Sequence, residues 1–152
     1  MQLRQLIRFF GLPLVISRLR EVFCYNDRMV KYFTPEEANQ VLPQVRTLVV
    51  QIMHARQAII DARPELWPVL EKGIGNGGSK KAGEVLAEFK RVEDGLAALK
   101  DLGVVVKDMS IGLIDFPALR GGREILLCWK YDEPQVAYWH ELQSGYAGRQ
   151  RI

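Results

Sequence analysis

The residues best suited to chemistry are concentrated in the last third of the chain. The segment 136–149 contains a histidine beside a glutamate, His140 and Glu141, and an arginine, Arg149, that follows two glycines. An acid further upstream, Asp115, ends an apolar run in the stretch LIDFP. A histidine with an acidic partner suits general acid–base chemistry, and an arginine suits the binding of an anion. Asp115, His140 and Arg149 are therefore candidate catalytic residues, with Arg149 as an anion clamp.

The same stretch also suits a binding site without catalysis, because aromatic walls with a few polar groups are typical of ligand pockets. The candidate ligand-binding residues are Trp129, Lys130, Tyr138, Trp139 and Glu141. A third interpretation is structural: His140 bonds a backbone carbonyl, and Arg149 pairs with Asp115 or Glu141 to pin the tail. A small-molecule ligand is compatible with the first two interpretations, and the residues indicate no particular cofactor.

The sequence favours neither a metal site nor a cysteine nucleophile. His140 and Glu141 are adjacent in an expected strand, so their side chains should point to opposite faces and cannot easily ligate together. Only two cysteines are present, and no H-E-x-x-H or similar spacing occurs, so we predict no metal site. Cys128 lies in the middle of ILLCWK, where a buried, unreactive thiol is the usual outcome.

Four runs rich in β-branched and aromatic residues must position these side chains. They span residues 104–108, 111–116, 123–130 and 136–141. The short connections between them favour an antiparallel meander. In the last strand, alternation places Tyr138 and His140 on one face and Trp139 and Glu141 on the other.

The register of the last hairpin decides whether Cys128 and His140 are partners. A three-residue loop around Glu133–Pro134 would put Cys128 opposite His140, whereas a four-residue loop would put it opposite Trp139. The strands carry apolar residues on both faces, so the sheet needs cover on both sides. Helices can cover one face. The C-terminal tail, the N-terminal segment or a second subunit must cover the other, and we expect a homodimer.

A helical region precedes the strands and has a clear start signal. Thr34 can cap a helix, Pro35 suits its first position, and Glu37 completes a capping box with Thr34. Pro43 follows soon afterwards, and a proline inside a helix removes a hydrogen bond. The sequence therefore predicts a short first helix with a kink or break at 40–43.

Two longer helices are predicted over 44–62 and 81–101. Each carries an apolar stripe with alternating spacings of four and three residues. The loop between them contains the literal pattern G-x-G-x-x-G at 73–78, but no strand precedes it, so a flexible linker is the better interpretation. The predicted fold class is α+β: a long antiparallel helical hairpin, preceded by a short capped helix and packed on a small antiparallel meander of about four strands.

Charge and composition limit the kinds of protein to which this chain can belong. The chain has 152 residues, 48% of them hydrophobic, which suits one domain. Residues 1–28 hold five arginines and two acids, and the remaining residues hold equal numbers of basic and acidic side chains. This balance counts against a nucleic-acid-binding core. No run of 18 apolar residues could span a membrane, and the low cysteine content fits the cytoplasm.

Several segments resemble a known prokaryotic family. KYFTPEEANQVLPQVR near residue 31, and then the GL-DF, LCWK, YWHE and G-AGR segments, are similar to the uncharacterised family numbered 2203 among domains of unknown function. The resemblance covers about residues 31–151. It supports Met29 as the natural start and leaves residues 1–28, an Arg-rich extension, outside the match. The alternatives for this extension are an amphipathic helix at a membrane interface and a targeting peptide. We expect residues 29–152 to form one domain. The resemblance implies no activity.

The leading functional expectation is a small protein that binds a ligand or partner through the polar and aromatic residues of the C-terminal sheet. The alternatives are an enzyme that uses His140 as general acid–base with Arg149 as anion clamp, and an interaction module whose helical hairpin docks a partner helix. A pocket that contains both His140 and Arg149 would favour the first two.

Overall fold

The computed structural model describes residues 30–72 and 80–152, so the predicted extension at 1–28 and the glycine-rich loop lie outside the described residues. Two helices come first, α2 (Pro35–Lys72) and α3 (Lys80–Asp101). Five strands follow: β1 (Val105–Asp108), β2 (Leu113–Arg120), β3 (Arg123–Lys130), β4 (Tyr138–Glu141) and β5 (Gln150–Arg151), with a short 3-10 helix, η1 (Tyr146–Gly148), before the last. The sheet is antiparallel in the order β1-β2-β3-β4-β5, so the α+β class is confirmed.

The predicted capping box forms at the start of α2. The Thr34 backbone N–H donates to Glu37 Oε2 over 2.9 Å, and the Glu37 N–H donates to Thr34 Oγ1 over 3.2 Å. Both bonds satisfy backbone donors that have no partner inside the helix. The start of this helix was therefore predictable from the few residues that form it.

The predicted break at Pro43 is wrong, because α2 runs without interruption from Pro35 to Lys72. Pro43 is exposed, while Leu42 and Val45 on either side of it are buried. A proline inside a helix costs about 3 kcal/mol. Burial of each large apolar side chain contributes about 1.5–3 kcal/mol, so packing of this stripe outweighs the local cost.

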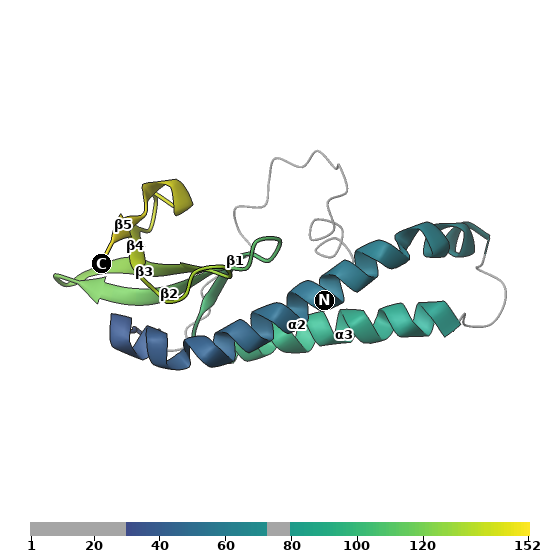
Figure 1. The fold of residues 1–152 in the computed structure, drawn as a ribbon, viewed down its shortest axis with the longest axis horizontal. Helices are drawn as coiled ribbons and strands as arrows, with labels where there is room; N and C mark the ends of the chain where they lie inside the picture. Colours follow the sequence, from purple (N-terminus) through teal and green to yellow (C-terminus); the bar gives the residue numbers. More distant parts are fainter. Residues whose placement is uncertain (1–29, 73–79) are drawn as a thin grey trace.

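The two helices lie side by side and antiparallel (Figure 1). Both predicted stripes face the interior, and the buried positions recur at intervals of seven residues. They are Val45, Ile52 and Ile59 on α2, and Val85, Val92 and Leu99 on α3. The sheet lies against the part of the hairpin where α2 begins and α3 ends, and the other end of the hairpin projects beyond it (Figure 1).

Gly95 allows the two helices to approach closely. A Cβ atom at this position would lie 2.6 Å from Ile52 Cγ1 and 2.9 Å from Ile52 Cδ1. Ile52 is fully buried, so we expect Gly95→Ala to lower the free energy of unfolding by about 1–3 kcal/mol. Gly83→Ala on the same helix meets nothing within 4 Å and should raise it by about 0.5–1 kcal/mol. Urea denaturation measures both, and a stabilising Gly95→Ala would contradict the close contact.

Contacts between the start of α2 and the β3–β4 loop hold that loop in place. Asn39 Nδ2 donates to the Val136 carbonyl over 3.2 Å, and the Val136 N–H donates to Asn39 Oδ1 over 2.9 Å. The guanidinium of Arg46 donates to the backbone carbonyls of Tyr131, Glu133 and Pro134. The helix therefore determines where β4 begins.

The chain turns back after β4 through η1 and ends as β5, which pairs with β4. This fifth strand was not predicted, although the sequence indicated a returning tail. The tail rises on the side of the sheet away from the helices (Figure 1). The C-terminal tail was one of three segments expected to cover this face of the sheet. Homodimerisation stays a prediction. No helix within the described ranges has the length and apolar character needed to cross a membrane.

Candidate functional site

The two faces of the sheet divide the candidate residues into separate groups. Trp129 and Trp139 face the helices and belong to the hydrophobic core, together with Phe116 and Leu127. Trp129 is fully buried, and its Nε1–H donates to the Glu133 carbonyl over 2.9 Å. Both tryptophans therefore pack in the protein interior, on the opposite side of the sheet from His140.

The face away from the helices brings together three side chains from three strands. Asp115 pairs directly with Cys128 across β2 and β3, and Cys128 pairs with Tyr138 on β4. His140 lies two residues beyond Tyr138 and therefore points to the same face. Asp115, Cys128 and His140 consequently form one cluster, which we call the Asp–Cys–His cluster.

Neither register expected for the last hairpin is correct. Cys128 lies opposite Tyr138 rather than His140 or Trp139, and Leu126 lies opposite His140. The connection between β3 and β4 is longer than predicted because Val136 leaves the strand to pack in the core and bond Asn39. His140 is thus a diagonal neighbour of Cys128 on one face.

The pairing of Asp115 with Cys128, in contrast, had a clear sequence signal. Strands β2 and β3 are joined by Gly121 and Gly122, which have φ angles of 59° and 77°. A two-residue turn with both φ angles positive is the favoured hairpin connection and determines the register of its strands. Counting outward from the glycines in RGGR places Asp115 opposite Cys128.

The Asp–Cys–His cluster is compact and almost completely removed from solvent. One donor atom from each residue lies within 4.8 Å of the other two. His140 Nε2 is 3.3 Å from Asp115 Oδ2. Cys128, Asp115 and His140 are 0%, 1% and 2% exposed. A carboxylate, a thiol and an imidazole thus lie together in a buried part of the protein.

Asp115 makes no well-aligned hydrogen bond with any group in residues 30–72 and 80–152, although the weak S–H donor of Cys128 lies beside it. Both of its carboxylate oxygens are buried, and neither accepts a hydrogen bond there. The nearest cation is Lys107, whose Nζ lies 3.7 Å from Oδ2. An unsatisfied buried carboxylate is costly, and buried polar groups are nearly always paired. Asp115 is therefore buried beside His140 and Lys107 but without a hydrogen bond to either side chain.

The orientation of His140 is determined by a backbone group. Its Nδ1 lies 2.8 Å from the Glu141 carbonyl oxygen. A carbonyl can only accept, so Nδ1 carries the hydrogen, and in the neutral ring Nε2 presents its lone pair to Asp115 and Cys128. With both nitrogens facing protein groups, His140 is poorly placed to exchange a proton with a substrate.

The contact between His140 and Asp115 is short but is not aligned as a hydrogen bond. Nε2 and Oδ2 are 3.3 Å apart, yet Oδ2 accepts no hydrogen bond. A lone pair and a carboxylate at this separation repel each other unless a proton or a metal ion lies between them, and the contact is not aligned for a shared proton. Two ligands of one metal ion show this arrangement, because each lone pair points to the ion rather than to the other ligand.

Cys128 is not an activated nucleophile. Burial raises the pKa of its thiol to about 12, and the neighbouring Asp115 carboxylate contributes in the same direction. The Arg149 guanidinium acts in the opposite direction but does not compensate. A nucleophilic cysteine needs an accessible thiolate, so the thiol chemistry available to Cys128 is that of a buried ligand.

Arg149 is engaged with other parts of the tail. Its Nη1 lies 2.7 Å from Glu133 Oε1, and its guanidinium stacks 4.6 Å from the Tyr138 ring centroid and 3.8 Å from that of Tyr146. This arrangement corresponds to the structural interpretation, with Glu133 as the partner instead of Asp115 or Glu141. Since its charge is already paired, Arg149 is poorly placed to clamp an external anion.

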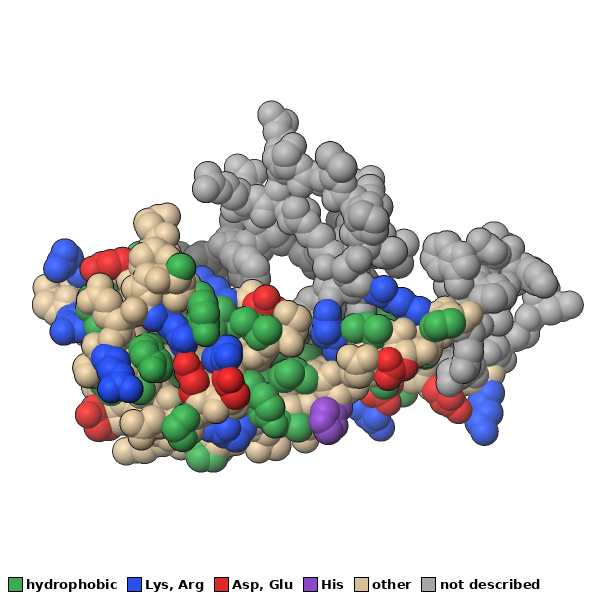
Figure 2. Space-filling model, turned by 45° about the horizontal axis from the view of Figure 1, so that its top comes forward, with side chains coloured by type: hydrophobic (Ala, Val, Ile, Leu, Met, Phe, Trp, Pro, Cys, Tyr) green, Lys and Arg blue, Asp and Glu red, His purple; other side chains and the backbone are tan. Residues whose placement is uncertain are grey.

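The remaining candidates lie apart from the cluster. The Lys130 ammonium pairs with Asp132 over 2.9 Å at the surface, and Glu141 is exposed. In Figure 2, acidic and basic side chains are interspersed over the described part of the visible face. That face therefore shows no broad patch of one charge.

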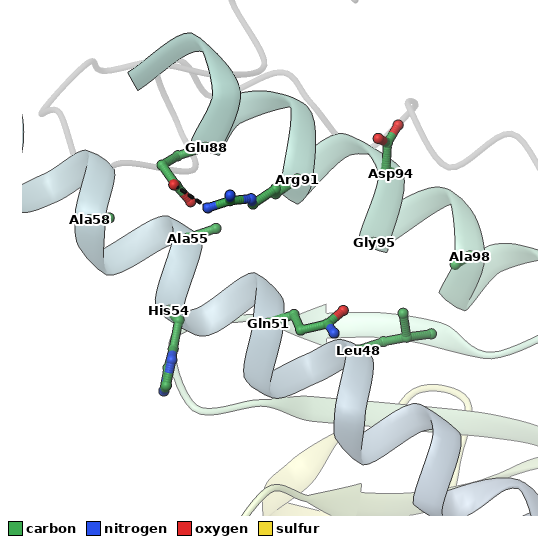
Figure 3. A pocket seen from close by; sticks show the side chains of 10 residues that line it. All are labelled: Leu48, Gln51, His54, Ala55, Ala58, Glu88, Arg91, Asp94, Gly95 and Ala98. Carbon is green, nitrogen blue, oxygen red and sulfur yellow. Dashed lines mark hydrogen bonds and ion pairs between the residues drawn. The ribbon is translucent and has the colours of Figure 1, made fainter. Parts of the chain in front are cut away.

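A concave groove lies between the two helices. Its lining includes Gln51, His54, Glu88 and Arg91, and Figure 3 shows the Glu88–Arg91 ion pair along α3 and the His54 ring directed away from α3. All the lining residues belong to α2 and α3, and none belongs to the Asp–Cys–His cluster. The convergent chemistry lies on the sheet, so the cluster is the candidate site.

Comparison with known proteins identifies the family of the chain. The model of a family described as an uncharacterised conserved protein (DUF2203) matches residues 31–152, and this confirms the resemblance drawn from the sequence segments. No curated protein and no solved structure matches the chain.

Proposed function

Because the chain belongs to the DUF2203 family, whose description names no activity, we propose a function from the geometry of the cluster alone: the domain binds one divalent transition-metal ion of the zinc class. Asp115, Cys128 and His140 are the proposed ligands. The observation that carries the proposal is the buried Asp115 carboxylate without hydrogen bonds, 3.3 Å from a histidine nitrogen whose lone pair faces it.

The donor set suits zinc in particular. Thiolate, imidazole and carboxylate are the ligands of Zn²⁺, whereas Mg²⁺ and Ca²⁺ prefer oxygen atoms only. With bonds of about 2.0–2.3 Å, the ligand atoms of a tetrahedral site lie about 3.3–3.7 Å apart. The 3.3 Å separation of Nε2 and Oδ2 fits this value, and no pair of donor atoms exceeds 4.8 Å. Small side-chain rotations would therefore complete the geometry.

The surroundings of His140 also suit a metal ligand. Metal-binding histidines usually donate their second ring N–H to a carboxylate or a backbone carbonyl, which fixes the tautomer and the ring orientation. The bond from Nδ1 to the Glu141 carbonyl is of this kind. The prediction of no metal site rested on the adjacency of His140 and Glu141, on the presence of only two cysteines and on the absence of a metal-binding spacing. The proposed set replaces Glu141 by Cys128, which comes from the neighbouring strand.

Cobalt titration of the metal-stripped protein tests the proposal. Co²⁺ is expected to bind at one ion per chain and to give thiolate charge-transfer absorption together with strong visible bands from a tetrahedral centre. Cys128→Ala, His140→Ala and Asp115→Asn should each weaken binding by about 100-fold or more, because each removes a direct ligand. Competition with Zn²⁺ should bleach the cobalt spectrum.

Matched controls are available within the same chain. Cys24→Ala removes the other cysteine, and His54→Ala removes the other histidine, which is exposed on α2. Both controls should keep the affinity for Co²⁺ unchanged. Circular dichroism establishes that each variant is folded. A wild-type spectrum without thiolate charge transfer, or equal loss in Cys24→Ala and Cys128→Ala, would overturn the proposal.

A further inference from the structure

The Asp–Cys–His cluster offers three protein ligands, and no fourth histidine, cysteine or acid joins it in the described parts of the chain. Structural zinc sites usually have four protein ligands, whereas three ligands leave one coordination position for water or an external molecule. The occupant of that position depends on the charges around it. Any such occupant requires the proposed metal site.

Lys107 is a charged side chain that reaches the cluster from solvent and, unlike Arg149, makes its ion pair with a residue of the cluster. Its side chain is 42% exposed, yet its Nζ lies 3.7 Å from Oδ2 of Asp115, which is 1% exposed. Solvent is therefore only one side chain away from the buried carboxylate. An external ligand that reaches the metal along this side would meet the lysine ammonium.

The backbone at Lys107 is irregular in a way that singles out this residue. Strand β1 pairs Val106 with Ile114 and then Asp108 with Leu113, so Lys107 is left over as the extra residue of a bulge. The strand lies at the edge of the sheet. Bulges at sheet edges often redirect a side chain toward a functional site. Here the side chain concerned is the one that approaches Asp115.

The charges around the cluster select the class of ligand. A divalent ion would be neutralised by the Asp115 carboxylate and the Cys128 thiolate, and the paired Arg149 and Glu133 cancel each other. Lys107 then remains as one uncompensated positive charge. A bound monoanion would neutralise the site, whereas a dianion would leave excess negative charge in a buried environment, which is unfavourable.

We propose that the fourth coordination position of the Asp115–Cys128–His140 site takes a small carboxylate ligand, and that Lys107 binds this carboxylate together with the metal. The metal supplies one bond to a carboxylate oxygen. The lysine ammonium supplies charge complementarity and a hydrogen bond to the carboxylate. Lys107 thus binds the carboxylate ligand, whereas Asp115, Cys128 and His140 bind the metal.

Acetate titration of the Co²⁺-loaded protein tests this proposal. Acetate should change the visible bands of the cobalt centre in a saturable manner. Lys107→Gln should weaken acetate binding about tenfold or more while changing the affinity for Co²⁺ less than about threefold, since the lysine does not touch the ion. Lys107→Arg should retain most of the acetate affinity, and Lys100→Gln, at an exposed position on α3, is the matched control.

The possible outcomes separate the two proposals. If Co²⁺ binds but acetate leaves the spectrum unchanged, or if Lys107→Gln responds like wild type, the metal site stands and the carboxylate inference is overturned. If sulfate, which is a dianion at neutral pH, binds more tightly than acetate, the assignment to a monoanion is wrong. If Co²⁺ does not bind, both proposals are overturned.

Discussion

Zinc is expected to raise the melting temperature of the metal-stripped protein by about 10 °C. A ligand that binds only the folded state at about 1,000 times its Kd contributes about 4 kcal/mol of stability. For a domain of about 150 residues, each kcal/mol shifts the melting temperature by about 2–4 °C. The physical source of this gain is the neutralisation of Asp115, whose two oxygens are buried without hydrogen bonds. Differential scanning calorimetry with and without zinc measures the shift.

Asp115→Asn separates loss of the metal from loss of the fold. The amide is similar in shape to the carboxylate but uncharged, so it costs less to bury. The stripped variant should therefore melt at or above the temperature of the stripped wild type, and zinc should no longer raise it. If zinc raises the melting temperature of the variant as much as that of the wild type, the stabilising ion binds elsewhere and the prediction is wrong.

Trp129→Ala is expected to lower the free energy of unfolding by about 3–5 kcal/mol. The indole is fully buried, and its Nε1–H donates to the Glu133 carbonyl. Arg46 lies 5.0 Å from its ring centroid, and Tyr131 contacts it edge to face. The substitution therefore leaves a large cavity and also releases the loop that precedes β4. Urea denaturation followed by circular dichroism measures the loss.

Trp129→Phe is the matched control for this prediction. It keeps an aromatic ring in the core but loses the indole N–H, so the expected loss is smaller, about 1–2 kcal/mol. The Glu133 carbonyl still accepts a hydrogen bond from Arg46. If Trp129→Ala instead stays within about 1 kcal/mol of wild type, Trp129 contributes little to the core, and the sequence-based expectation of a ligand contact would gain support.

Features that depend on a few neighbouring residues were predictable from the sequence. The capping box of Thr34 and Glu37 and the stripes of the two helices follow from local hydrogen bonds and helical periodicity. The split between Tyr138–His140 and Trp139–Glu141 follows from strand alternation. The break at Pro43 was wrongly predicted because the hydrogen bond that proline removes can be inferred from the sequence, whereas the burial of the residues around it cannot.

The α+β class was predictable from the order of helical and strand patterns, and the Gly121–Gly122 turn is a local signal, not used in the prediction, for the pairing of Asp115 with Cys128. The place of His140 beside these two residues, in contrast, depends on contacts between distant segments. The register of β3 and β4 depends on Val136, which bonds Asn39 from a helix 97 residues earlier in the chain. A contact over that distance leaves no local pattern, because its energy arises only when the helix and the sheet pack together.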